Sequence, residues 1–313
     1  CISTNNGTDA LILSLKSLGV KNGDEVITVC NSFYASAGAI DACGAKVVFV
    51  DSDERYQIDV DKIEKAITKK TKVIMPVHWA GASPNMPQII SIAKKYKIKV
   101  IEDACMGIGA KVLNKSPGTF GDVNAFSMHP LKSLNVMGDG GMIGTNNDKI
   151  ANWLRKYRNH GMINRDTLSM WGVNVRMQPL QAVVAEIQLK NVDKIIKKRI
   201  INANFLDKEL SKNKNIKIPL RVKGYRETFA LYMANFKKRD KLKKYLIKNK
   251  IEVKIHYPKP LHLQKPSKKA GFKKGNFPVA ESQAKELLTL PVHQYLNMDQ
   301  LKYMVKKIED FYK

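Results

Sequence analysis

Residues 126–135 read FSMHPLKSLN, and residues 138–141 follow as GDGG. This stretch places one lysine, Lys132, in a loop between two apolar, strand-like segments, Val123 to Ser127 and Met142 to Thr145. A lysine in such a loop can serve as an amine nucleophile toward a carbonyl cofactor. About thirty residues upstream, the apolar strand that starts at Val100 ends on the acid pair Glu102-Asp103. A lysine and a strand-end aspartate are the pair that pyridoxal phosphate requires, one for its aldehyde and one for its pyridine nitrogen.

Length and composition indicate a globular protein with one large and one small domain. The chain has 313 residues, of which 44% are hydrophobic, and no apolar run is long enough to span a bilayer. No secretory signal is visible. The four cysteines show no Cys-x-x-Cys spacing, which predicts a reducing, cytoplasmic setting. The chain begins at Cys1, directly before a strong motif, so we expect an N-terminal piece to be missing.

The net charge of +26 raises the question of nucleic-acid binding. Only nine of the 54 basic residues are arginine, and the lysines are spread over predicted helix faces. Surfaces that follow a phosphate backbone usually concentrate their charge and add arginine or stacking aromatics. The pattern favours solvated faces over a nucleic-acid site, and the surplus can attract an anionic substrate.

Apolar strand-like runs alternate with helical patterns from residue 8 to about residue 145. The predicted helices and strands follow the chain as residues 8–19, Val26 to Cys30, Lys46 to Val50, Val60 to Ile67, Lys72 to Val77, Met86 to Tyr96 and Ile98 to Glu102. Such alternation predicts a mainly parallel sheet covered by helices on both faces.

The length and type of the predicted elements change after a long helical pattern that runs from Pro179 past Ile196. The later segments are short and of mixed type, namely Phe229 to Phe236, Arg239 to Asn249, Val253 to His256 and Asp299 to Phe311. We therefore expect an α/β fold with a large domain over residues 1–200 and a small α/β domain over residues 201–313.

Seven motifs in order give the chain its resemblance to a known family, the DegT/StrS-type nucleotide-sugar aminotransferases. They are Asn6–Leu11, Gly23–Val26, Ile101–Ala104, Phe126-Ser127 with Lys132, Arg158–Gly161, Gly172–Met177 and His256–Pro258. The resemblance covers nearly the whole chain. It implies an aspartate-aminotransferase-like (fold-type I) large domain, pyridoxal 5′-phosphate as cofactor, and a homodimer with shared active sites.

The resemblance also implies a role for individual residues. The cofactor-binding set is Gly7, Thr8, Asp9, Phe33, Asp103, Met106, Ser127, Lys132, Asn174 and Arg176. Lys132 and Asp103 are the catalytic pair. Asn174 and Arg176 lie in the segment that reaches the partner's cofactor phosphate in the family. Without the resemblance, each of these residues has a structural explanation: Thr8 caps a helix, Phe33 packs in the core, and Asp103 caps the helix that follows a strand.

Met106 departs from the family pattern. Glutamine or histidine usually stands three residues after the aspartate and hydrogen-bonds the phenolic oxygen of the cofactor. A thioether is at best a weak acceptor. The contact is therefore either lost or supplied elsewhere.

The expected substrate side is built from His129, His256, Tyr257 and His293. The His256 to Gln264 loop resembles one found in family members that aminate 3-keto sugars. His256 and His262 lack a third ligand nearby, so no metal site is expected. Each single histidine is equally a satisfied polar residue of the fold.

The function implied is transfer of an amino group from an amino acid, glutamate by analogy, to a nucleotide-diphosphate keto sugar. Two alternatives stay open. Some relatives are sugar dehydratases, but they carry histidine where this chain has Lys132. A regulatory or nucleic-acid-binding protein on the same scaffold is the other alternative, suggested by the charge and by Met106. No membrane partner is expected.

Overall fold

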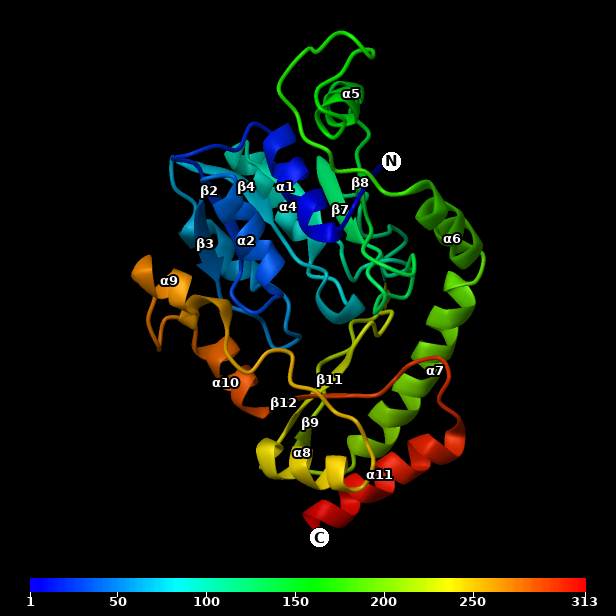
Figure 1. Ribbon diagram of the computed structural model, residues 1–313. Helices are drawn as coiled ribbons and strands as arrows, with labels where there is room; N and C mark the ends of the chain where they lie inside the picture. The colour runs from blue at the N-terminus through cyan, green and yellow to red at the C-terminus, as the bar shows by residue number, and fades with distance from the viewer.

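Seven strands form one mixed sheet in the order β1-β8-β7-β5-β4-β2-β3 (Figure 1). The computed structural model describes residues 1–313. The strands are β1 (Ile2–Thr4), β2 (Glu25–Val29), β3 (Lys46–Val50), β4 (Thr71–Met75), β5 (Lys99–Asp103), β7 (Val123–Ser127) and β8 (Gly141–Gly144). β2, β3, β4, β5 and β7 pair in parallel, whereas β8 is antiparallel to both β7 and β1. The predicted mainly parallel sheet is confirmed.

Helices cover both faces of this sheet. One face packs against α1 (Gly7–Ser17), α2 (Tyr34–Ala42) and α5 (Asp148–Tyr157). The opposite face packs against η1 (Val60–Lys62), α3 (Ile63–Ala66) and α4 (Met86–Tyr96). All five residues of β2 are buried, as expected of a strand with helices above and below it.

The C-terminal part builds a second core on a small antiparallel sheet in the order β12-β11-β9. Its elements are α7 (Val192–Leu210), β9 (Ile216–Lys217), β11 (Tyr232–Phe236), α8 (Arg239–Lys248), β12 (Leu287–Leu290) and α11 (Met298–Tyr312). The remaining elements are η2 (Trp79–Gly81), β6 (Lys111–Val112), α6 (Pro179–Leu189), β10 (Tyr225–Arg226), η3 (Leu261–Leu263), α9 (Lys265–Lys269) and α10 (Pro278–Glu286). No helix is both long enough and apolar enough to cross a membrane.

Two local predictions are corrected. The single long helix from Pro179 is wrong, because α6 ends at Leu189 and α7 begins at Val192. The cap of α1 is Asn6, whose side chain accepts the N–H of Asp9 at 2.8 Å, so Thr8 lies inside the helix. Residue 200 lies within α7, and the domain limits stay a prediction.

A buried carboxylate ties β5 to the loop that follows β6. Glu102 is fully buried, and its oxygens accept hydrogen bonds from His78 Nε2 at 2.9 Å and from the backbone N–H groups of Gly118, Phe120 and Gly121 at 2.7–2.8 Å. Burial by itself raises the pKa of Glu102, but these hydrogen bonds outweigh it and hold the pKa below its usual value. The carboxylate therefore fixes the strand immediately before Asp103.

Replacing this carboxylate should destabilise the fold. In Glu102→Ala, the buried His78 and three partly buried backbone N–H groups lose their acceptor, so we expect the free energy of unfolding to fall by about 3–5 kcal/mol. Urea unfolding followed by circular dichroism measures the change. The matched control is Glu252→Ala, whose side chain is exposed and pairs only with Lys254; its loss should stay within about 0.5 kcal/mol. Equal losses in the two variants would contradict the structural role of Glu102.

Candidate active site

The carboxyl ends of two parallel strands and the start of a helix meet at one edge of the sheet. Asp103 at the end of β5 pairs with Ala125 of β7, two residues before Ser127. Helix α1 begins against the end of β7, since a Cβ placed on Gly7 would lie only 2.7 Å from the Cβ of Ser127. Only glycine allows this approach. Carboxyl ends of parallel strands are where α/β folds bind ligands.

A cavity of about 530 Å³ opens at this edge. The predicted site residues that line it are Gly7, Thr8, Asp9, Phe33, Asp103, Met106, Ser127, His129, Lys132, His256 and Tyr257. They come from segments spread over more than two hundred residues of sequence. The fold therefore brings together most of the residues predicted for one site.

The carboxylate of Asp103 is buried and has no basic partner in an ion pair. Its Oδ2 accepts a hydrogen bond from Ser36 Oγ at 2.7 Å, and Ser36 Oγ lies 2.8 Å from Ser32 Oγ. Its Oδ1 accepts the N–H of Cys105 at 3.3 Å. A buried carboxylate held by neutral donors alone favours a cation beside it. A protonated pyridine nitrogen fits that requirement.

The side chain of Lys132 is free. It lies partly buried in the loop after β7, and its amine makes neither a hydrogen bond nor an ion pair. Burial lowers the pKa of the Lys132 ammonium, although Cys105 and Asp103 nearby act in the opposite direction. A lower pKa leaves more of the amine neutral and able to attack a carbonyl carbon.

The start of α1 offers a cradle for a phosphate. The N–H of Asp9 is taken by the Asn6 side chain, while the N–H groups of Gly7 and Thr8 have no partner in the protein. These N–H groups belong to a helix end that carries partial positive charge, and the hydroxyl of Ser127 lines the same cavity. The phosphate, the aldehyde and the ring nitrogen of pyridoxal phosphate thus each have a suitable group in one cavity.

Aromatic side chains form one wall of the cavity. The ring centroids of Phe33 and Tyr257 lie 6.0 Å apart, those of Tyr34 and Tyr257 lie 5.3 Å apart, and those of Trp79 and Tyr257 lie 5.6 Å apart. Phe33 is 48% exposed, so it is not a core residue. Burial raises the pKa of Tyr257 to about 12. An exposed ring at the mouth of the cavity can stack on a planar ligand.

Two of the predicted histidines line the same cavity. His129 Nδ1 accepts the N–H of Leu131 at 3.2 Å, which leaves Nε2 to face a ligand. His256 Nδ1 lies 2.9 Å from Thr289 Oγ1, and burial lowers its pKa, assisted by Lys254 and Lys132. Burial and the two lysines thus both disfavour the charged form of His256.

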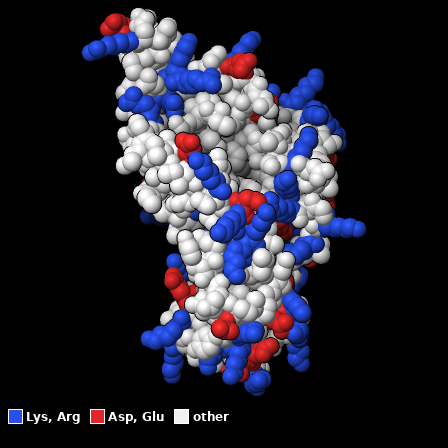
Figure 2. Space-filling model, turned by 90° about the vertical axis from the view of Figure 1, so that its right-hand side faces the viewer, with Lys and Arg blue, Asp and Glu red and all other residues white.

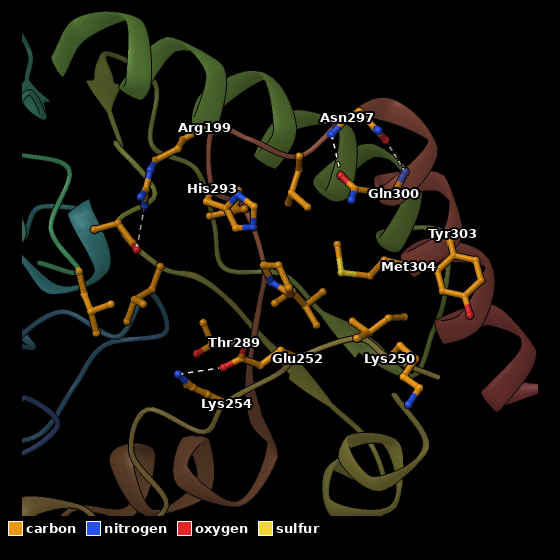
Figure 3. A pocket seen from close by; sticks show the side chains of 18 of the residues that line it. Arg199, Lys250, Glu252, Lys254, Thr289, His293, Asn297, Gln300, Tyr303 and Met304 are labelled. Atoms are coloured by element: carbon orange, nitrogen blue, oxygen red, sulfur yellow. Dashed lines mark hydrogen bonds and ion pairs between the residues drawn. The ribbon is translucent and has the colours of Figure 1, made fainter. Parts of the chain in front are cut away.

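Three predicted residues lie outside the cavity. Arg176 donates hydrogen bonds to Asn174 Oδ1 and Asn159 Oδ1, both at 2.8 Å, on an exposed segment. His293 lines a second cavity of about 640 Å³ in the C-terminal part, with Arg199 and Tyr303 (Figure 3). Within a single chain, the structure does not place these three side chains beside Lys132.

Sequence reasoning missed other lining residues. Ser32 lines the cavity next to the predicted aromatic position. Its Oγ lies 2.8 Å from Ser36 Oγ, which donates a hydrogen bond to Asp103 across 67 residues of sequence. Trp79 and Cys105 also line the cavity and belong to no motif. A polar cluster directly after the apolar strand β2 was the one local signal for the two serines.

Comparison with known proteins places the chain in a family. Residues 1–309 match the model of the DegT/DnrJ/EryC1/StrS aminotransferase family. The pleiotropic regulatory protein of Geobacillus stearothermophilus is 39% identical over 100% of this chain and 85% of its own length. A dTDP-3-amino-3,6-dideoxy-alpha-D-galactopyranose transaminase of Aneurinibacillus thermoaerophilus is 37% identical over 99% of this chain and 85% of its own length.

The structural comparison agrees. DesV from S. venezuelae, an X-ray structure, superimposes with a TM-score of 0.97 at 31% identity, covering 100% of this chain and 84% of its own. The aspartate-aminotransferase-like α/β fold expected from the sequence is confirmed. This chain belongs to the DegT/DnrJ/EryC1/StrS aminotransferase family and uses pyridoxal 5′-phosphate as its cofactor.

Proposed function

We propose that this aminotransferase moves an amino group from glutamate to a nucleotide-diphosphate 3-keto sugar, for amino-sugar biosynthesis in the cytoplasm. The observation that carries the proposal is the cavity itself. It combines a free lysine amine at Lys132, a buried carboxylate at Asp103 and an open helix start at Gly7. The Aneurinibacillus relative is a transaminase whose name carries a dTDP-linked sugar with its amine at C3.

The chain's own residues divide the chemistry between them. When bound, pyridoxal phosphate supplies an electron sink for negative charge at the substrate carbon. Asp103, held by Ser36, would keep the ring nitrogen of the bound cofactor positive. The amine of Lys132 would carry a proton from the α-carbon of the amino donor to the cofactor in the first half of the reaction, and a proton from the cofactor to the sugar carbon in the second half. Tyr257 and the small-domain loops shield this carbon from bulk water.

The same residues bear on the two alternative functions, a sugar dehydratase and a regulatory or nucleic-acid-binding protein. A dehydratase of this family has histidine at the position of Lys132, and the free amine here argues for transamination. A regulatory role has support from the name of the Geobacillus relative, which is a pleiotropic regulatory protein. A protein that only binds partners does not need a reactive amine beside a buried carboxylate. Visible absorption after addition of pyridoxal phosphate separates an enzyme from such a binder.

A homodimer is supported by exposed apolar surface. Helix α6 has no buried residue although it carries Leu180, Val183, Ile187 and Leu189, and Trp171 before it is 88% exposed. Such a patch on a folded protein is typical of an interface. Figure 1 shows α6 at the periphery, with the long loop that carries Asn174 and Arg176 before it. We propose that a second copy covers this surface and that the two polar residues reach the partner's cavity.

The charge distribution suits a diphosphate substrate. Lysine and arginine side chains border the hollow on the face shown in Figure 2 and outnumber the acidic ones there. Clefts lined by one sign of charge raise the local concentration of oppositely charged ligands. Capture of the nucleotide sugar should therefore weaken as salt is added.

Lys132 should carry the cofactor covalently. Borohydride reduction of the loaded protein, followed by peptide mass mapping, should find the pyridoxyl adduct on Lys132. Lys132→Ala should lose turnover by several orders of magnitude, because both the covalent link and the proton carrier are removed. The exposed Lys254→Ala is the control and should keep the adduct. An adduct on another lysine would remove the basis of the assignment.

The sugar specificity is tested by product analysis. With glutamate and nucleotide-linked 3-keto or 4-keto sugars supplied in parallel, we expect an amine at C3 of the 3-keto substrate. The Lys132→Ala protein serves as the blank. Amination only at C4 overturns the regiochemical part of the proposal, while no amination with any donor and any keto sugar overturns the function.

Shared active sites predict complementation between inactive chains. Lys132→Ala chains are mixed with Asn174→Ala/Arg176→Ala chains under conditions of proven subunit exchange. Half of the dimers then contain one chain of each kind, and each of these has one intact site. Activity should rise to about a quarter of the wild-type value. Activity that stays at the level of the parents would count against residues from two chains in one site.

A further inference from the structure

The phenolic oxygen of the cofactor is the one polar group of the ring without an obvious partner in this cavity. The phosphate, the aldehyde carbon and the ring nitrogen have the start of α1, Lys132 and Asp103. The phenolic oxygen lies on the ring carbon next to the one that bears the aldehyde, and it carries negative charge when ionised. Such an oxygen needs a hydrogen-bond donor. Met106 lines the cavity but has no N–H or O–H to offer.

Trp79 carries a hydrogen-bond donor that has no acceptor. Its side chain is only 1% exposed and lines the same cavity, yet its indole Nε1 has no hydrogen-bond partner. Buried N–H groups in folded proteins are nearly always paired, so an unpaired one calls for an explanation. The indole nitrogen is a donor only and cannot be satisfied by acting as an acceptor. A ligand oxygen in the cavity would supply the missing acceptor.

The strand pairing places Trp79 beside Met106. Val77, two residues after the end of β4, forms an isolated parallel bridge to Asp103 at the end of β5. Trp79 stands two residues beyond Val77, and Met106 stands three residues beyond Asp103. Both side chains pack in the same apolar cluster. The two positions therefore approach the cofactor site from neighbouring strand ends.

The backbone of Trp79 is also held in place. Its N–H donates to Gln57 Oε1 at 3.3 Å, and its carbonyl accepts from Gln57 Nε2 at 3.2 Å. Its ring packs against that of Tyr257, with centroids 5.6 Å apart. These contacts limit the freedom of the indole to find another acceptor. A donor that is fixed before the ligand arrives binds with little further loss of entropy.

We propose that the indole N–H of Trp79 donates a hydrogen bond to the phenolic oxygen of pyridoxal phosphate, the contact that Met106 cannot make. The inference rests on the cofactor site of the proposed function and assigns Trp79 to it. The hydrogen bond withdraws negative charge from the oxygen. That oxygen otherwise stabilises the proton on the nitrogen that joins Lys132 to the cofactor, so the donor lowers the pH at which this proton is lost.

The test is a pH titration of the visible absorption of the loaded protein. Trp79→Phe keeps an aromatic ring and removes the N–H. We expect the midpoint to rise by about 0.3–1 pH unit and the Kd for pyridoxal phosphate to rise by about two- to tenfold, as for loss of one hydrogen bond. The matched control is Trp153→Phe, whose ring stacks on Tyr157 in α5 and does not line the cavity. Its titration should match the wild type.

Rescue at position 106 separates a lost hydrogen bond from lost packing. Met106→Gln introduces a donor three residues after Asp103. In the Trp79→Phe background it should return the midpoint toward the wild-type value, whereas in the wild-type background it should change the midpoint little. Such non-additivity is the signature of two donors that compete for one acceptor. Equal shifts in both backgrounds would overturn the proposal.

A second measurement does not depend on the Trp79→Phe variant folding. The chain has three tryptophans, so a ¹⁵N-labelled sample gives three indole N–H resonances. Trp153→Phe and Trp171→Phe identify two of them, and the third belongs to Trp79. Adding pyridoxal phosphate should move the Trp79 resonance downfield, as expected of a new hydrogen bond. A Trp79 resonance that stays in place while visible absorption develops overturns the inference and leaves the proposed function standing. Absence of visible absorption in the wild type overturns the cofactor site itself.

Discussion

The parallel pairing of β4, β5 and β7 is the constraint on which the site depends. It aligns their carboxyl ends, so that Asp103, Ser127 and the segment around Trp79 emerge at one edge of the sheet. The close approach of Gly7 to Ser127 then adds the start of α1 to the same edge. A shift of β5 by one residue would turn Asp103 to the other face of the sheet. The buried network around Glu102 opposes that shift.

The cavity is electrostatically incomplete as the polypeptide alone builds it. A buried carboxylate and a partly buried amine each lack an ion-pair contact, and the first N–H groups of α1 have no acceptor. Each of these costs folding free energy. Pyridoxal phosphate carries the complement of each, a protonatable nitrogen, a carbonyl carbon and a phosphate. The cofactor should therefore stabilise the fold as well as supply the chemistry.

The sheet was predictable because its strands are short apolar runs bounded by helical patterns. The placement of Asp103 at the end of such a run, and of Lys132 in the loop after another, was predictable for the same reason. The contacts that complete the site were not. The hydrogen bond from Ser36 to Asp103 joins residues far apart in sequence, and an unpaired indole N–H at Trp79 is visible only in three dimensions. His293 was predicted at the substrate side and lines a second cavity, which shares Leu131, Ala230, Leu231 and His256 with the first; its role stays a prediction.

The C-terminal part contributes to the site through one wall of the cavity. Ala230, Leu231 and Tyr257 face the cofactor-binding residues across it, and Arg199 donates hydrogen bonds from α7 to the carbonyl groups of Phe229 and Ala230. The N–H of Leu231 in turn donates to the carbonyl of Ala80, next to Trp79. This wall is therefore tied both to the small core and to the strand end that holds Trp79. The same wall therefore connects the small core to the edge of the sheet that binds the cofactor.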